Sequence, residues 1–69
     1  MKNLTERETE VVELLAKGLT NKEIGEELFI SRHTVKAVLE KVYEKIGIHN
    51  RVLVAMYVIK HNRNVLEKL

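Results

Sequence analysis

Residues 20–46 read TNKEIGEELFISRHTVKAVLEKVYEKI. Thr20 and Glu23 form a capping box, in which each side chain accepts a hydrogen bond from the other residue's backbone amide. The apolar residues that follow predict a helix over about 21–28. A longer helix is predicted over about 32–46, because apolar residues recur there at spacings of three and four. They are Val35, Val38, Leu39, Val42 and Ile46.

The spacing of these residues fits a helix-turn-helix, in which two helices are held at a steep angle. When Asn21 is counted as the first position, apolar residues occupy positions 4, 8, 10, 15 and 18, which are Ile24, Leu28, Ile30, Val35 and Val38. Gly25 is the small residue needed where the two helices touch. Position 9 is often glycine in such units, and Phe29 at that place predicts a variant turn.

Another helix should precede this unit. Thr5 and Glu8 form a further capping box, and Gly18 is a natural left-handed stop, so this helix is predicted over about 6–17. Residues 1–69 are long enough for one domain only. With a fourth helix after the unit, we expect an all-α domain, a four-helix bundle that contains the helix-turn-helix.

The fourth helix is predicted over about 51–61, after Gly47 ends the long helix and Asn50 caps the next one. Its apolar residues form two stripes at helical spacing. The stripe assigned to the core contains Val52, Ala55, Met56 and Ile59. The stripe assigned to an interface with a second copy of the chain contains Val54, Tyr57, Val58 and His61. The alternative is that residues 65–69 fold back over this second stripe.

Composition excludes several classes of function. The chain has no cysteine and no aspartate, and its three histidines lack metal-ligand spacing, so we expect no metal site and no cofactor. Neither a Ser-His-acid arrangement nor a glycine-rich phosphate loop can be assembled, so we expect no enzymatic activity. No small-molecule ligand is expected either. The longest apolar run, residues 52–59, is too short for a membrane span, and the sequence starts without a signal peptide. A cytoplasmic protein is expected.

The charge is uneven along the chain. Residues 1–30 carry four Lys or Arg against seven Glu, whereas residues 31–69 carry eight against three. A polyanion would therefore meet the second half first. The polar face of residues 32–46 suits a DNA major groove. The candidate contacts to DNA bases are Arg32, His33, Lys36, Ala37 and Glu40. The candidate contacts to DNA phosphates are Thr20, Lys22, Ser31, Thr34 and Lys41.

Plainer interpretations of these residues remain open. A polar helix face is usually solvated whether or not it binds anything. Lys22 can serve solubility alone, Thr34 can hydrogen-bond within its own helix, and His33 can be a solvated surface residue. The apolar spacing, the small Gly25 and the two capping boxes favour the DNA-binding interpretation.

From Leu4 to Arg51 the chain resembles the C-terminal effector domain of the LuxR/NarL/FixJ superfamily, in its GerE-like form. The matching stretches are LTERETEVVELLAKGLTNKEIGEELFIS, HTVK and KIGIHNRV. They follow one another at the family's spacing and cover about two-thirds of the chain. The resemblance implies a recognition helix over about 32–46 that enters the major groove, and a dimerisation helix over about 51–61.

Carried over by position, the resemblance makes Lys36 and Ala37 the leading base contacts and gives Lys22 and Thr34 contacts to the DNA backbone. Two positions depart from the family's pattern. Family members commonly have histidine where this chain has Val38, and several have a polar or basic residue where it has Glu40. Glu40 either accepts a hydrogen bond from cytosine or repels phosphates and pairs with a neighbouring lysine.

We therefore expect a sequence-specific DNA-binding transcription regulator, or the effector domain of a response regulator, that binds duplex DNA as a homodimer. RNA polymerase is a candidate further partner. The alternative is a protein-interaction module that docks on polymerase, a sigma factor or another regulator through its fourth helix. A nearer alternative is the promoter-reading domain of a sigma factor.

Overall fold

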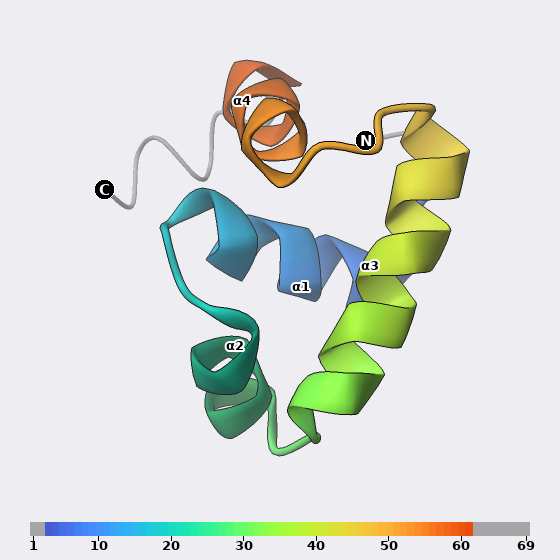
Figure 1. The fold of residues 1–69 in the computed structure, drawn as a ribbon. Coiled ribbons are helices and arrows are strands. Elements are labelled where there is room, and N and C mark those ends of the chain that lie inside the picture. The colour runs from blue at the N-terminus through green and yellow to red at the C-terminus, as the bar shows by residue number, and fades with distance from the viewer. Residues whose placement is uncertain (1–2, 62–69) are drawn as a thin grey trace.

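The computed structural model describes residues 3–61, which form four helices and no strand (Figure 1). The helices are α1 (Glu6–Ala16), α2 (Asn21–Leu28), α3 (Arg32–Ile46) and α4 (Arg51–His61). The predicted all-helical fold is confirmed, and the helix bounds agree with the predicted ones to within a residue. The suggested folding back of residues 65–69 lies outside the described residues.

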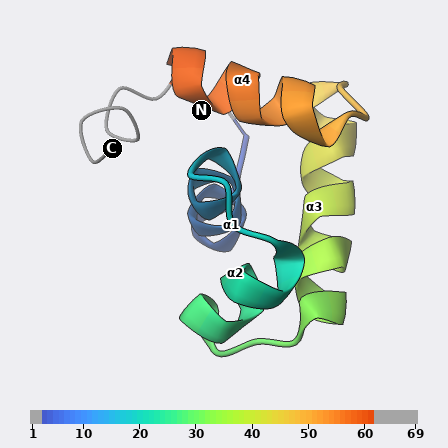
Figure 2. The same ribbon diagram turned by 60° about the vertical axis from the view of Figure 1, so that its left-hand side comes forward.

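Helix α1 is central to the arrangement. It packs against each of the other three helices, and both views show it between α2 and α4 (Figures 1 and 2). Helix α3 runs alongside and contacts both α1 and α2. Residues 29–31 join α2 to α3, so these two helices form the helix-turn-helix. None of the helices within residues 3–61 combines the length and apolar character that crossing a membrane requires.

A single apolar core holds the four helices together. Burying a side chain such as Val, Leu or Ile contributes about 1.5–3 kcal/mol relative to leaving it exposed, so a few such residues per helix suffice. The buried apolar residues are Val11, Val12, Leu15, Ile24, Val35, Leu39, Val42, Val54 and Val58. Because they come from all four helices, the exposed face of each helix is fixed relative to the others.

Both predicted capping boxes are present. The Thr5 hydroxyl oxygen accepts a hydrogen bond from the Glu8 amide at 3.1 Å, and the Glu8 carboxylate accepts one from the Thr5 amide at 2.8 Å. At the start of α2, the Thr20 hydroxyl oxygen accepts from the Glu23 amide at 3.2 Å, and the Glu23 carboxylate accepts from the Thr20 amide at 2.8 Å. These bonds satisfy amides that have no partner inside the helix.

The turn between α2 and α3 is the predicted variant. Phe29 caps α2 in the left-handed conformation, with φ of 59°, and its side chain is 94% exposed. Gly25 lies against this turn, and an added Cβ would come within 2.5 Å of the Ile30 carbonyl oxygen. The expectation that a small residue is needed where the helices touch is thus confirmed.

Helix α4 faces the core with the opposite stripe from the one expected. Val54 and Val58, which were assigned to an interface with a second copy, are fully buried. Val52 and Met56, which were assigned to the core, are 65% and 60% exposed. The assignment was wrong because α4 is apolar around most of its circumference, so periodicity identifies two stripes without ranking them.

The other residues of these two stripes lie between the extremes. Ala55, Tyr57 and Ile59 are partly buried against the core, and His61 is exposed. The rings of Tyr57 and His61 lie against each other with centroids 4.4 Å apart. Tyr57 and His61 therefore remain at the edge of the buried face and not on the outer face of the helix.

Candidate nucleic-acid interface

The exposed face of α3 carries every residue predicted to contact DNA bases. Val35, Leu39 and Val42 are buried on the other side of the helix and fix its rotation about its own axis. The exposed residues of α3 on the predicted face are Arg32, His33, Lys36, Ala37, Glu40 and Lys41. An α-helix with a free polar side of this length has the dimensions that the major groove admits.

The charges on this face favour an anionic partner. Arg32, Lys36 and Lys41 are exposed cations, and Glu40 is the carboxylate among them. Within residues 3–61 the one ion pair joins Glu8 to a lysine elsewhere on α3, so the suggested pairing of Glu40 with a neighbouring lysine is not found there. Over the same residues these three cations form no ion pair, so they are available to phosphates or base edges.

The start of α3 offers hydroxyl and amide donors. The Ser31 hydroxyl oxygen accepts a hydrogen bond from the Thr34 amide at 3.1 Å, and the two hydroxyl groups lie 3.0 Å apart. One hydroxyl donates to the other, which leaves a single O–H proton for a further acceptor. The amides of Arg32 and His33 have no acceptor within the helix, and they point out of its N-terminal end, where the hydroxyl groups lie. This end of α3 suits a phosphate oxygen.

The start of α2 places a further cation beside α3. Lys22 is exposed in the first turn of α2, next to the capping residue Thr20. A hollow of about 460 Å³ lies beside the turn that joins the two helices. It is lined by Lys22, Gly25, Glu26, Phe29, Ile30 and Arg32. The structure therefore brings Lys22 and Arg32 to one hollow, whereas Lys41 lies more than two turns further along α3.

One arrangement beside this face was missed by the sequence analysis. The Arg51 guanidinium, at the first residue of α4, donates to the Asn21 side-chain oxygen at 2.6 Å and to the Leu19 carbonyl oxygen at 2.7 Å. No local pattern predicts bonds between residues about thirty positions apart. The only signal was a charged residue at the start of an apolar helix, which is equally typical of a solvated terminus.

Comparisons with known proteins agree with this architecture. A model of the family described as bacterial regulatory proteins, luxR family, matches residues 2–58. The transcriptional regulatory protein LiaR of Bacillus subtilis is 47% identical over 55 residues, which are 80% of this chain and 26% of that protein. A nitrate/nitrite response regulator protein homolog of Haemophilus influenzae is 39% identical over 61 residues, 88% of this chain and 29% of that protein.

A third relative is the probable transcriptional regulatory protein SgaR of Hyphomicrobium methylovorum. It is 41% identical over 64 residues, which are 93% of this chain and 30% of that protein. The chain thus spans less than a third of the length of these curated relatives. The family model covers most of the four-helix unit. The chain therefore belongs to the luxR family of bacterial regulatory proteins.

Proposed function

We propose that this chain is a sequence-specific DNA-binding unit of a transcription regulator, which inserts α3 into the major groove. One observation supports this most strongly: α3 is fixed by its buried apolar side while its opposite side presents Arg32, Lys36 and Lys41 to solvent. Lys36 and Ala37 lie mid-face, where base edges are read. The proposal includes no enzymatic activity, and it places the chain in the cytoplasm, where bacterial DNA lies.

Phosphate contacts are proposed to supply most of the affinity. Lys22 and Thr20 at the start of α2, and Ser31 and Thr34 at the start of α3, lie at helix N-termini that favour anions. Lys41 would meet the backbone further along the groove. Because these contacts are the same on every sequence, specificity falls to the base contacts of α3.

A homodimer is proposed to read a two-fold symmetric site through α4. The outer face of α4, defined here as Val52, Leu53 and Met56, is more than half exposed at each residue. It lies opposite the buried Val54 and Val58. An exposed apolar group on a small domain favours association. This outer face replaces the stripe that the sequence analysis assigned to the dimer, whereas Tyr57 and His61 stay candidates for its edge.

The test compares two lysines on one selected duplex. Lys36→Ala should weaken binding to the selected site by about 1–3 kcal/mol and leave binding to random duplex little changed, because a base contact is lost. Lys22→Ala should weaken both alike and reduce the slope of log K against log salt by about 1. Binding is measured by titration at several salt concentrations on DNA selected from a random pool.

Lys17→Ala is the matched control, since Lys17 is an exposed lysine at the end of α1, outside the proposed interface. Lys17→Ala should leave the ratio of affinities for selected and random duplex unchanged. It should change the salt slope by no more than the general effect of removing one charge. Equal losses for Lys36→Ala on selected and random duplex, at unchanged thermal stability, would contradict the assignment of α3 to base recognition.

The exposed outer face of α4 also supports a second candidate, a module that docks on polymerase, a sigma factor or another regulator. The two candidates differ in their dependence on α3. Function that survives simultaneous replacement of Arg32, Lys36 and Lys41 by alanine would favour the docking module. Loss of function in that triple variant, with the fold retained, favours DNA binding.

A further inference from the structure

Arg51 connects two helices that otherwise have little direct contact. Helices α2 and α4 each pack on α1, from different sides (Figure 2). The Arg51 guanidinium spans from the first residue of α4 to the Asn21 side chain at 2.6 Å and to the Leu19 carbonyl at 2.7 Å. Two bonds from one planar group fix orientation as well as distance. Arg51 therefore holds the first turn of α2 relative to α4.

Both ends of this connection adjoin residues with proposed roles. Asn21 lies between Thr20 and Lys22, the proposed phosphate contacts of α2. Arg51 directly precedes Val52, the first residue of the outer face of α4. The half-buried guanidinium thus lies between the place where a phosphate would be held and the place where a second copy would pack.

In a symmetric dimer, each copy would have one such connection between its phosphate-binding turn and the helix that pairs with the other copy. The separation of the two phosphate-binding turns depends on how rigidly each turn is held to the helix that forms the dimer. A hydrogen bond from a charged group is about twice as strong as a neutral one, and unlike apolar packing it is directional. Without the guanidinium, the Asn21 oxygen and the Leu19 carbonyl lose these partners. The start of α2 is then held only by its packing on α1 and α3 and, in the described part of the chain, has no direct bond to α4.

We propose that Arg51 is a positioning residue that sets the half-site spacing of the DNA bound by a dimer. The inference rests on the proposed function, because it requires DNA binding by α2 and α3 and pairing through α4. The proposed role requires no contact between Arg51 and base or phosphate. It acts through Asn21 and Leu19 on the first turn of α2.

The experiment measures affinity for a series of duplexes. DNA selected by the wild-type chain is varied by inserting or removing one and two base pairs between its half-sites, at fixed salt. The wild type should prefer one spacing by about tenfold or more, the scale of one hydrogen bond to a charged group. Arg51→Gln should bring this ratio close to one, whereas Lys22→Ala should lower all affinities and keep the ratio.

Controls separate positioning from stability. A variant that is merely less folded has a smaller active fraction, which scales every affinity equally and leaves the spacing ratio unchanged. Arg51→Lys retains the charge and one donor group, so it should restore part of the ratio. Arg7→Gln removes the same kind of side chain from an exposed position on α1 and should behave as wild type.

The outcomes distinguish the two proposals. A wild-type spacing preference that Arg51→Gln retains in full would overturn the role of Arg51 and leave DNA binding intact. A wild-type chain that binds no duplex at low salt would overturn both. If Arg51→Gln fails to fold, Asn21→Ala provides the test, because it removes one acceptor and should flatten the spacing preference as well. An unchanged ratio in a folded Asn21→Ala variant would also overturn the proposal.

Discussion

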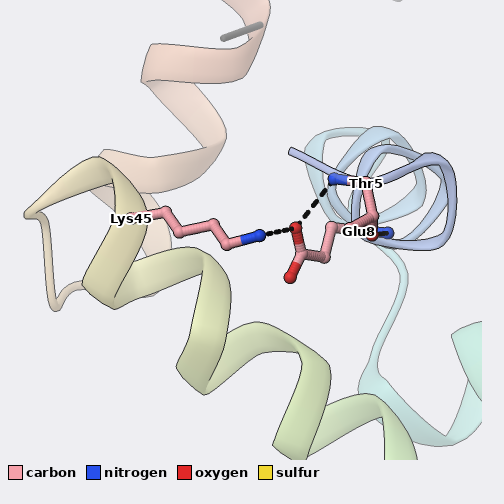
Figure 3. A network of polar contacts seen from close by, with 3 residues as sticks. All are labelled: Thr5, Glu8 and Lys45. Carbon is pink, nitrogen blue, oxygen red and sulfur yellow. Dashed lines mark hydrogen bonds and ion pairs between the residues drawn. The ribbon is translucent and has the colours of Figure 1, made fainter. Parts of the chain in front are cut away.

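Glu8 on α1 and Lys45 in the last turn of α3 form an ion pair, with 2.7 Å between Oε1 and Nζ (Figure 3). The same carboxylate oxygen accepts the Thr5 amide at 2.8 Å, so the cap of α1 is also its connection to the end of α3. The Glu8 side chain is 6% exposed and that of Lys45 36%. The pair therefore lies at the edge of the core and is partly shielded from solvent.

The Glu8 carboxylate should make stability depend on pH. The hydrogen bond from Lys45 and the one from the Thr5 amide lower the pKa of Glu8 below its ordinary value, and burial opposes them only in part. A pKa lower in the folded state stabilises the fold above the unfolded pKa of about 4.3, and this contribution is lost as pH falls through the folded value. Urea unfolding of Glu8→Gln from pH 7 to pH 3 should therefore show a weaker pH dependence than wild type.

Glu23 provides the comparison for this experiment. It caps α2 in the same way, and its pKa is lowered by the Thr20 amide, but no lysine pairs with it within residues 3–61. Glu23→Gln should flatten the pH profile less than Glu8→Gln does. Identical profiles for the two variants would show that the Lys45 ion pair contributes nothing beyond the cap.

Phe29 should be replaceable with a gain in stability. Its left-handed backbone costs an L-residue about 1–2 kcal/mol, and glycine avoids that cost while losing about 0.5–1 kcal/mol in chain entropy. The exposed ring contributes no burial that would be lost. Phe29→Gly should raise the free energy of unfolding by up to about 1.5 kcal/mol, measured by urea titration. Phe29→Ala retains the backbone strain and should not raise the free energy of unfolding. Equal stability of the glycine and alanine variants would argue against strain in the turn.

Gly25 should not accept a large side chain. A Cβ there would lie 2.5 Å from the Ile30 carbonyl oxygen and 3.3 Å from the Arg32 amide nitrogen, both of which are backbone atoms. Gly25→Leu should cost about 1–3 kcal/mol through overpacking, despite a helix-propensity gain of about 1 kcal/mol. Glu26→Leu, at the exposed neighbouring position, should stay within about 0.5 kcal/mol. If Gly25→Leu melts at the same temperature as the wild type, α2 and α3 can move apart at this contact without a loss of stability.

The two faces of α4 should respond differently to substitution. Val58→Ala should cost about 2 kcal/mol in stability, because Val58 is fully buried. Met56→Glu should leave stability unchanged and weaken binding to a duplex with two half-sites more than to one with a single half-site. His61→Glu is the contrast, since His61 belongs to the stripe first assigned to the dimer. If His61→Glu, and not Met56→Glu, shows the half-site effect, the dimer uses that stripe.

The parts of the fold that could be predicted are those set by residues close together in the sequence. Helix bounds followed from Thr5, Thr20 and Ser31, because a cap is recognised from residues three positions away. The orientation of α4 did not follow, since Val54 and Val52 are equally apolar and only packing against α1 distinguishes them.

The candidate site divides in the same way. The exposed face of α3 could be predicted because Val35, Leu39 and Val42 mark its opposite side. The bonds made by Arg51 and Lys45 could not be predicted, because they join residues thirty or more positions apart on different helices or a loop. Such pairs depend on the tertiary arrangement, which periodicity does not encode.

The small size of the outer face of α4 affects how DNA binding depends on the amount of protein in the cell. Val52, Leu53 and Met56 offer much less surface than the roughly 800 Å² per partner that a stable interface buries. Two copies should therefore meet mainly when a shared duplex raises their local concentration. Promoter occupancy would then rise with about the square of the amount of free chain, so a modest change in synthesis or degradation would produce a threshold response.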